Sequence, residues 1–106
     1  MMTKLIAAVE QLVNDEYARA SKDHGERFHS QHEAYAIIKE EVEEAKESLI
    51  KLEDTLCNIW SCNCRRDSDD MYDYRLRSLK RFAVDAAAEC IQVAAMAHKA
   101  RQGVKK

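Results

Sequence analysis

The chain has 106 residues, 46% of them hydrophobic and 34% charged, with a formal net charge of −2 at pH 7. This charge gives no general attraction to nucleic acid or to an anionic membrane, and no stretch approaches the roughly 20 apolar residues of a membrane span. The length is typical of one domain, which we expect to cover residues 1–106. The absence of proline and the presence of only two glycines favour long helices over a sheet.

The first predicted helix covers residues 4–21. Thr3 is a plausible N-cap, and the apolar side chains that follow recur at helical spacing. Gly25 comes after this segment and is the residue type that most often ends a helix in the left-handed conformation. The apolar run near the N-terminus is short and broken by Glu10, which does not fit a signal peptide. We therefore expect a cytoplasmic protein.

The second predicted helix begins at a clear start signal. Ser30 followed by Glu33 is a capping-box pattern, and the helical period then continues to about Trp60. Glu41 falls inside the apolar stripe of this helix, and Glu44 lies at its edge. Because a carboxylate is rarely buried without a partner, Glu41 is not expected to be an ordinary solvated charge. The stripe consists of Ala34, Ile38, Ala45, Leu49, Leu52, Leu56 and Ile59.

Residues 61–70 have no periodicity and predict a polar loop. A third helix is expected over residues 71–101, either continuous or broken near Ser78. Between Phe82 and Ala97 this helix is apolar on opposing faces, so several neighbours must cover it. The remaining two helices of one chain are too few for that. We therefore predict an all-α helical bundle that is completed by homo-oligomerisation, as a dimer or a tetramer.

A second group of polar side chains lies on the third helix. Asp85, Glu89 and Gln92 follow one another at intervals of about one turn, in a segment that is otherwise largely apolar. Taken alone, this polar strip fits a face turned toward water. Together with Glu41 the strip indicates a bound cation, because clustered carboxylates repel one another and oxygen ligands suit a cation such as Mg²⁺. The sequence thus predicts a metal site between two helices.

The chain contains four cysteines, which is an even number and permits two disulfides. Without a secretion signal, free thiols are the expected state. Cys57, Cys62 and Cys64 also raise the alternative of a zinc site. Their spacing is not the paired C-x-x-C of zinc ribbons, and no nearby histidine completes a tetrahedral set. Zinc is therefore the weaker interpretation.

Three segments resemble a known family, and the likeness covers about residues 15–100. Glu40-Glu41-x-x-Glu44 resembles the E-E-x-x-E motif of the MazG-type all-alpha nucleotide pyrophosphohydrolases. The family's second motif is E-x-x-D, and Gln92 stands here where the aspartate is expected, after a longer gap than usual. The two segments that resemble the phage and bacterial MazG-like branch are Phe28-His29-Ser30-x-His32-Glu33-Ala34-Tyr35 and Glu89-x-x-Gln92-Val93-Ala94-Ala95-Met96-Ala97.

This resemblance implies the family's helical bundle and the hydrolysis of a nucleoside triphosphate to the monophosphate and pyrophosphate, with Mg²⁺ as cofactor. Glu41, Glu44 and Glu89 are the implied metal ligands. Either Glu40 or Asp85 is a further ligand or the base that orients the attacking water. The candidate catalytic carboxylates are Glu40 and Glu41. The candidate substrate contacts are His29, His32, Gln92, Lys99 and Arg101.

Other classes of protein fit the chain less well. A di-iron bundle requires Glu-x-x-His on two helices, and the sole instance here, Glu26 to His29, lies in the turn after Gly25. The basic side chains around Arg77 are interleaved with aspartates, which indicates a solvated face rather than a nucleic-acid interface. The main alternative is a catalytically inactive helical assembly or regulatory protein that keeps the family fold and has lost activity through Gln92.

Overall fold

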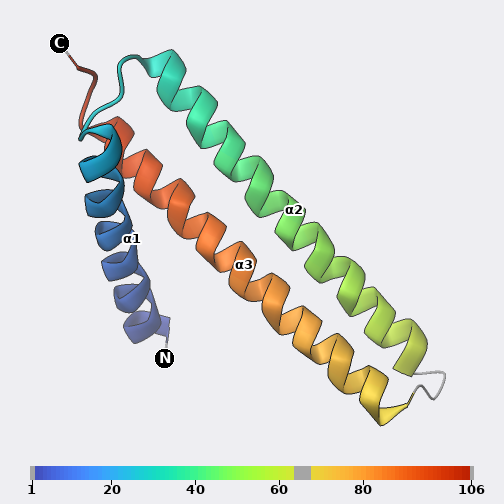
Figure 1. Ribbon diagram of the computed structural model, residues 1–106. Helices are drawn as coiled ribbons and strands as arrows, with labels where there is room; N and C mark the ends of the chain where they lie inside the picture. The colour runs from blue at the N-terminus through green and yellow to red at the C-terminus, as the bar shows by residue number, and fades with distance from the viewer. Residues whose placement is uncertain (1, 64–67, 106) are drawn as a thin grey trace. The chain divides into compact units, whose positions relative to one another are not determined.

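The computed structural model describes residues 2–63 and 68–105. It contains three helices, α1 (Met2–His24), α2 (Gln31–Asn63) and α3 (Asp69–Arg101), which Figure 1 labels along the chain. These described residues form no strand, so the predicted all-α class is confirmed. None of their helices combines the length and the apolar character that crossing a bilayer requires.

Helix α1 is longer at both ends than the predicted span of residues 4–21. It begins at Met2, so Thr3 lies inside the first turn and is not the N-cap. The prediction that Gly25 ends this segment is confirmed, because Gly25 has a φ of 85° and its N–H donates to the Ser21 carbonyl oxygen at 2.9 Å. A residue with a Cβ is strained at such a φ, which explains why glycine stands there.

Helix α2 begins where the capping box predicts. The Ser30 hydroxyl oxygen accepts a hydrogen bond from the Glu33 N–H at 3.0 Å. The Glu33 carboxylate reaches back and accepts from the His29 N–H at 3.1 Å, one residue before the cap rather than at the cap itself. Two N–H groups that the helix cannot satisfy internally thereby gain partners. The helix ends at Asn63, three residues beyond the predicted end.

The predicted loop over residues 61–70 is wrong at both of its ends, since residues 61–63 belong to α2 and residues 69–70 to α3. Ser68 is the N-cap of α3, and its hydroxyl accepts from the Met71 N–H at 3.2 Å. Asp69 and Asp70 then occupy the first turn, where negative charge is favourable. The rest of that predicted loop, residues 64–67, lies outside the described residues. Helix α3 is continuous through Ser78, because serine costs only a few tenths of a kcal/mol in a helix interior.

The chain divides into two compact units, and the expectation of one domain over residues 1–106 stays a prediction. Unit 1 consists of Met1–Val42 and Glu89–Lys106, and unit 2 of Glu43–Ala88. The core of unit 1 is built around Phe28, whose side chain is 1% exposed. The small alanines around it allow the helices to approach closely. The buried residues of this core are Ala20, Phe28, Ala34, Ala95 and Met96.

The connection between α1 and α2 is held from both sides within unit 1. The Tyr17 hydroxyl donates to the Glu26 carbonyl oxygen at 3.0 Å. Beyond α3, the Lys105 N–H donates to the Phe28 carbonyl oxygen at 2.8 Å, and Val104 forms a parallel bridge with Phe28. The last part of the described chain therefore lies beside Phe28, and it fixes the residues that lead into α2.

Unit 2 has little core of its own. Among its described residues the buried hydrophobic side chains are Ala45 and Ala86. Leu49 and Leu56 belong to the predicted apolar stripe of α2 but are 44% and 54% exposed, and Trp60 is 74% exposed. A monomeric protein rarely exposes so much apolar surface in one region, since covering it is favourable.

We predict that replacing Ser30 with alanine lowers the free energy of unfolding by about 1 kcal/mol, because the Glu33 N–H loses its acceptor. The measurement is the midpoint of urea unfolding, followed by circular dichroism at one protein concentration. Ser61→Ala, at an exposed position of α2, is the matched control and should change the midpoint little. Equal effects of the two substitutions would contradict the capping role.

Candidate metal centre and adjoining pocket

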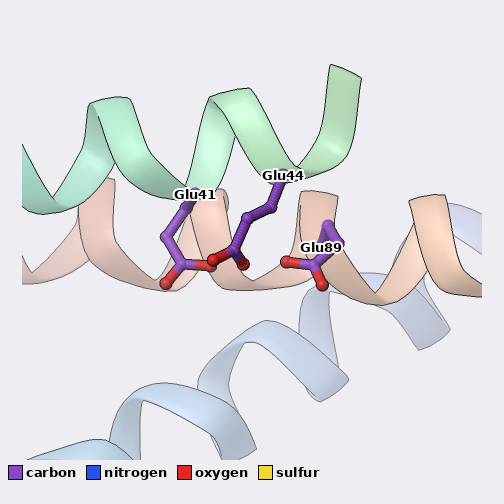
Figure 2. A group of neighbouring side chains, drawn as sticks. All are labelled: Glu41, Glu44 and Glu89. Atoms are coloured by element: carbon purple, nitrogen blue, oxygen red, sulfur yellow. The ribbon is translucent and has the colours of Figure 1, made fainter. Parts of the chain in front are cut away.

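Three of the four predicted metal ligands lie together. Glu41, Glu44 and Glu89 each offer a carboxylate oxygen, and these oxygens lie within 4.8 Å of one another. Figure 2 shows the carboxylates of Glu41 and Glu44 extending from α2 toward the carboxylate of Glu89 on α3. Glu41 and Glu89 belong to unit 1, and Glu44 follows Glu41 by one turn of the same continuous helix. We call these three residues the glutamate cluster.

The donor set of the glutamate cluster fits a hard divalent cation. Mg²⁺ prefers carboxylate oxygens and water, and it usually takes few protein ligands because it gives up its waters reluctantly. Three carboxylates held this close repel one another, and a cation between them removes that repulsion. Glu41 and Glu89 are half-buried and Glu44 is exposed, so the cluster is open to solvent and to a ligand on one side.

The remaining predicted carboxylates are not members of the cluster. Asp85 accepts a hydrogen bond from the Arg81 Nε at 3.2 Å, and the pair belongs to unit 2. Arg81 lies one turn before Asp85, where opposite charges on a helix meet. Glu40 is exposed on α2 and offers no oxygen to the described cluster.

A pocket of about 460 Å³ in unit 1 adjoins the cluster, because Glu41 belongs to both. It brings in three of the predicted substrate contacts, His29, Gln92 and Lys99. The other two, His32 and Arg101, are exposed and do not line this pocket. Its walls come from α1, the connection before α2, α2 and α3, and the lining residues are Arg19, Ala20, His24, Phe28, His29, Glu33, Ile37, Glu41, Gln92, Met96 and Lys99.

Lys99 is the one charged residue that is buried among those described, at 5% exposure. Its Nζ lies 4.5 Å from the centre of the Phe28 ring, which is a cation–π arrangement. The described residues supply no carboxylate to this ammonium. A buried cation of this kind is costly unless a ligand or water completes its hydrogen bonds.

A polar network connects α1 to the pocket. The Gln92 Nε2 donates to the Glu16 carboxylate at 2.8 Å, across 76 residues of sequence. The Arg19 Nε also donates to Glu16, at 3.0 and 3.1 Å to its two oxygens. The hydrogen bonds from Arg19, and secondarily that from Gln92, hold the pKa of Glu16 below its usual range against the opposing effect of burial. Because Glu16 accepts only, it fixes which way the Gln92 amide points.

The sequence pattern does not single out Glu16, Arg19 or His24. The first two are three residues apart on α1, which suggests only a surface ion pair. Their link to Gln92 depends on the packing of α1 against α3, and no local signal reveals it. His24 lies at the end of α1 and enters the pocket lining through the turn at Gly25.

The structure describes three of the four cysteines and part of the basic group. Cys57, Cys62 and Cys90 are free thiols, and Cys64 lies outside the described residues. Arg77 pairs with Asp73 at 2.9 Å on α3, where both side chains are exposed. The neighbouring Arg65, Arg66 and Asp67 also lie outside the described residues.

Comparison of the chain with protein-family models, with curated proteins and with solved structures gives no match.

We predict that Glu16→Gln makes the stability of the protein less dependent on pH in acid. Glu16 has a lowered pKa in the folded state, so its contribution is present above its unfolded pKa of about 4.3 and is lost as the pH falls through the folded value. The wild type should therefore be the more stable protein at neutral pH, and the gap should shrink toward pH 3. Urea midpoints over a pH series measure this.

The matched control is Glu10→Gln, at an exposed position of the same helix. Its difference from the wild type should stay nearly constant over the same pH series. A Glu16→Gln gap that is also constant with pH would show that the Glu16 network does not stabilise the fold through its charge.

Proposed function

We propose that the protein hydrolyses a nucleoside triphosphate to the monophosphate and pyrophosphate, with Mg²⁺ as cofactor. The observation that carries this proposal is that Glu41 belongs both to the glutamate cluster and to the pocket. A cation site and a substrate-sized pocket that share a residue suit a reaction at a phosphate group. The resemblance to the MazG-type enzymes, described above from the motifs, points to the same chemistry.

The chain's own residues divide into two roles in this proposal. Glu41, Glu44 and Glu89 hold the ion, and Glu41 also faces the pocket, so it is the residue best placed to orient a water toward the α-phosphorus. Arg19 lines the pocket and offers donors to phosphate oxygens, while His29 lines it beside Glu33. When bound, Mg²⁺ supplies charge neutralisation at the phosphate oxygens and activation of the water. Positioning and charge neutralisation account for most catalysis of such reactions, and no side-chain nucleophile is required.

Gln92 takes a different role from the aspartate of the family pattern. Its amide N–H group is used by Glu16, so the amide oxygen is directed away from that carboxylate. Gln92 lies one turn after Glu89 on α3, and helical neighbours at this spacing share a face. In this proposal its oxygen is a neutral acceptor beside the ion site, which is a weaker ligand than a carboxylate.

The second candidate function is that of a catalytically inactive assembly or regulatory protein with the same fold. It is favoured by the neutral Gln92 and by the exposed apolar surface of unit 2. Both candidates include a homo-oligomer, a dimer or a tetramer, in which a second copy covers that surface. The exposed side chains Leu5, Ile6, Val9 and Leu12 form a further apolar stripe on α1 that a partner copy would cover.

We predict that Glu41→Gln abolishes Mg²⁺-dependent release of pyrophosphate. The same substitution should leave the metal-free fold equally stable, or more stable by roughly 1 kcal/mol, because it removes repulsion within the cluster. Mg²⁺ should raise the melting temperature of the wild type, since an ion at ten times Kd stabilises the folded state by about 1.4 kcal/mol. Differential scanning fluorimetry with and without Mg²⁺ measures this response.

Lys51→Gln is the control for this experiment, because Lys51 is an exposed residue of α2 outside the cluster. It should keep both the response to Mg²⁺ and the turnover of nucleotide. If the Glu41→Gln variant melts with the wild-type response to Mg²⁺ and still releases pyrophosphate, the metal site is not where we place it. A wild type that binds Mg²⁺ but hydrolyses no common nucleotide would favour the inactive alternative.

We predict that the protein is an oligomer at micromolar concentration. Multi-angle light scattering should give at least twice the 12.2 kDa mass of one chain. Trp60→Glu places a charge on the most exposed large apolar side chain of unit 2, and it should weaken association while leaving the helix content unchanged. A wild-type mass of a single chain would rule this assembly out.

A further inference from the structure

The pocket in unit 1 has two chemically different ends. Glu41 lies at one end with Gln92, and Glu33 lies at the other end with Lys99. Two observations establish this arrangement: Glu41 approaches Glu89 at the cluster, while Phe28, just before α2, is bridged to Val104, just after α3. The two helices thus run in opposite directions past the pocket. Eight residues of α2 separate Glu33 from Glu41, which is about 12 Å along the helix axis.

Arg19, His24 and His29 also line the pocket, and part of the wall between its two ends is apolar. Ile37 of α2, Met96 of α3 and Ala20 of α1 line this part. Apolar walls that lie between two polar ends suit a flat ring system whose edges carry polar groups and whose faces do not. A nucleotide has this distribution of polarity, with the phosphates at one end and the edge of the base at the other.

Lys99 is a donor in a fixed position at the far end of the pocket. The residue is 5% exposed, and its Nζ lies 4.5 Å from the centre of the Phe28 ring. An ammonium group donates hydrogen bonds and accepts none. A ligand atom that faces it must therefore be an acceptor, and a buried donor that meets another donor loses its hydrogen bond at a large cost.

Glu33 is the complementary acceptor at the same end. One oxygen of its carboxylate already accepts from the His29 N–H, which holds the side chain at the start of α2. A carboxylate accepts hydrogen bonds and donates none when it is ionised. A ligand atom that faces Glu33 must therefore be a donor.

We propose that this end of the pocket binds a nucleobase and selects those that carry a carbonyl oxygen beside a ring N–H. Lys99 then donates to the carbonyl oxygen, and Glu33 accepts from the N–H. Guanine, hypoxanthine, uracil and thymine have this edge. Adenine and cytosine carry an exocyclic amino group in place of the carbonyl oxygen, so they meet Lys99 donor to donor. This inference rests on the proposed function for the placing of the phosphates at the Glu41 end.

The test measures binding of GMP, UMP, AMP and CMP to the full chain by equilibrium dialysis without Mg²⁺. GMP and UMP should bind about tenfold more tightly than AMP and CMP, the size expected for one well-formed base contact. Lys99→Met keeps the length of the side chain and its packing on Phe28 but removes the donor. Glu33→Gln replaces a carboxylate, which only accepts hydrogen bonds, with an amide that can also donate. Each should reduce the preference to about threefold or less.

Lys80→Met is the matched control, because Lys80 is exposed on the same helix and loses the same charge. It should keep the full preference. Circular dichroism verifies that each variant is folded, and Lys99→Gln replaces Lys99→Met if the latter is not. The amide of this second variant can donate and accept, so it should also lose the preference.

Three results would overturn the inference. The first is equal binding of the four monophosphates, or none at all, by the wild type. The second is a Lys99→Met variant that keeps the preference. The third is a Lys99→Met variant that binds all four monophosphates more weakly by one common factor, which would make Lys99 a phosphate contact. Failure of the proposed function gives a different result, because base preference without Mg²⁺ would persist in a protein that releases no pyrophosphate.

Discussion

The start of α2 at Ser30 is the constraint on which the candidate site depends. Ser30 caps the helix, and Glu33 reaches back to the His29 N–H, so the first turn can form in one register only. From that start, residues four apart face the same way, and Glu33, Ile37 and Glu41 all line the pocket. A start displaced by one residue would turn these side chains about 100° away. The Lys105 bond to Phe28 and the Tyr17 bond to Glu26 hold the same segment from outside the helix.

Charged side chains are unevenly distributed over the candidate site. The glutamate cluster adjoins one end of the pocket through Glu41, and the buried residue Lys99 lines the other end. Each arrangement costs free energy in the protein alone, through repulsion in the first case and desolvation in the second. The ligand proposed above carries a cation at one end and a hydrogen-bonding edge at the other.

Unit 2 raises a different physical problem. Its described buried hydrophobic residues are two alanines, while leucines, a tryptophan and tyrosines of both helices are exposed. Two helices with so small a core gain little from burial, which is the main favourable contribution to folding. An intermolecular contact would supply the missing burial, which is why both proposed functions include an assembly of several copies.

The sequence alone was sufficient for features that depend on local geometry. The absence of proline, the cap at Ser30, the glycine at position 25 and the period of the apolar residues determine the helices within a few residues, because each acts over one or two turns. The same period placed Glu41 and Glu44 on one side of α2. The predicted start of α3 was two residues late, since the Ser68 cap lies among other polar residues. The tertiary structure alone decided the rest. It paired Gln92 with Glu16 across 76 residues and buried Lys99 against Phe28. These outcomes depend on which faces of α1, α2 and α3 meet, and helical periodicity specifies a face without specifying its neighbour.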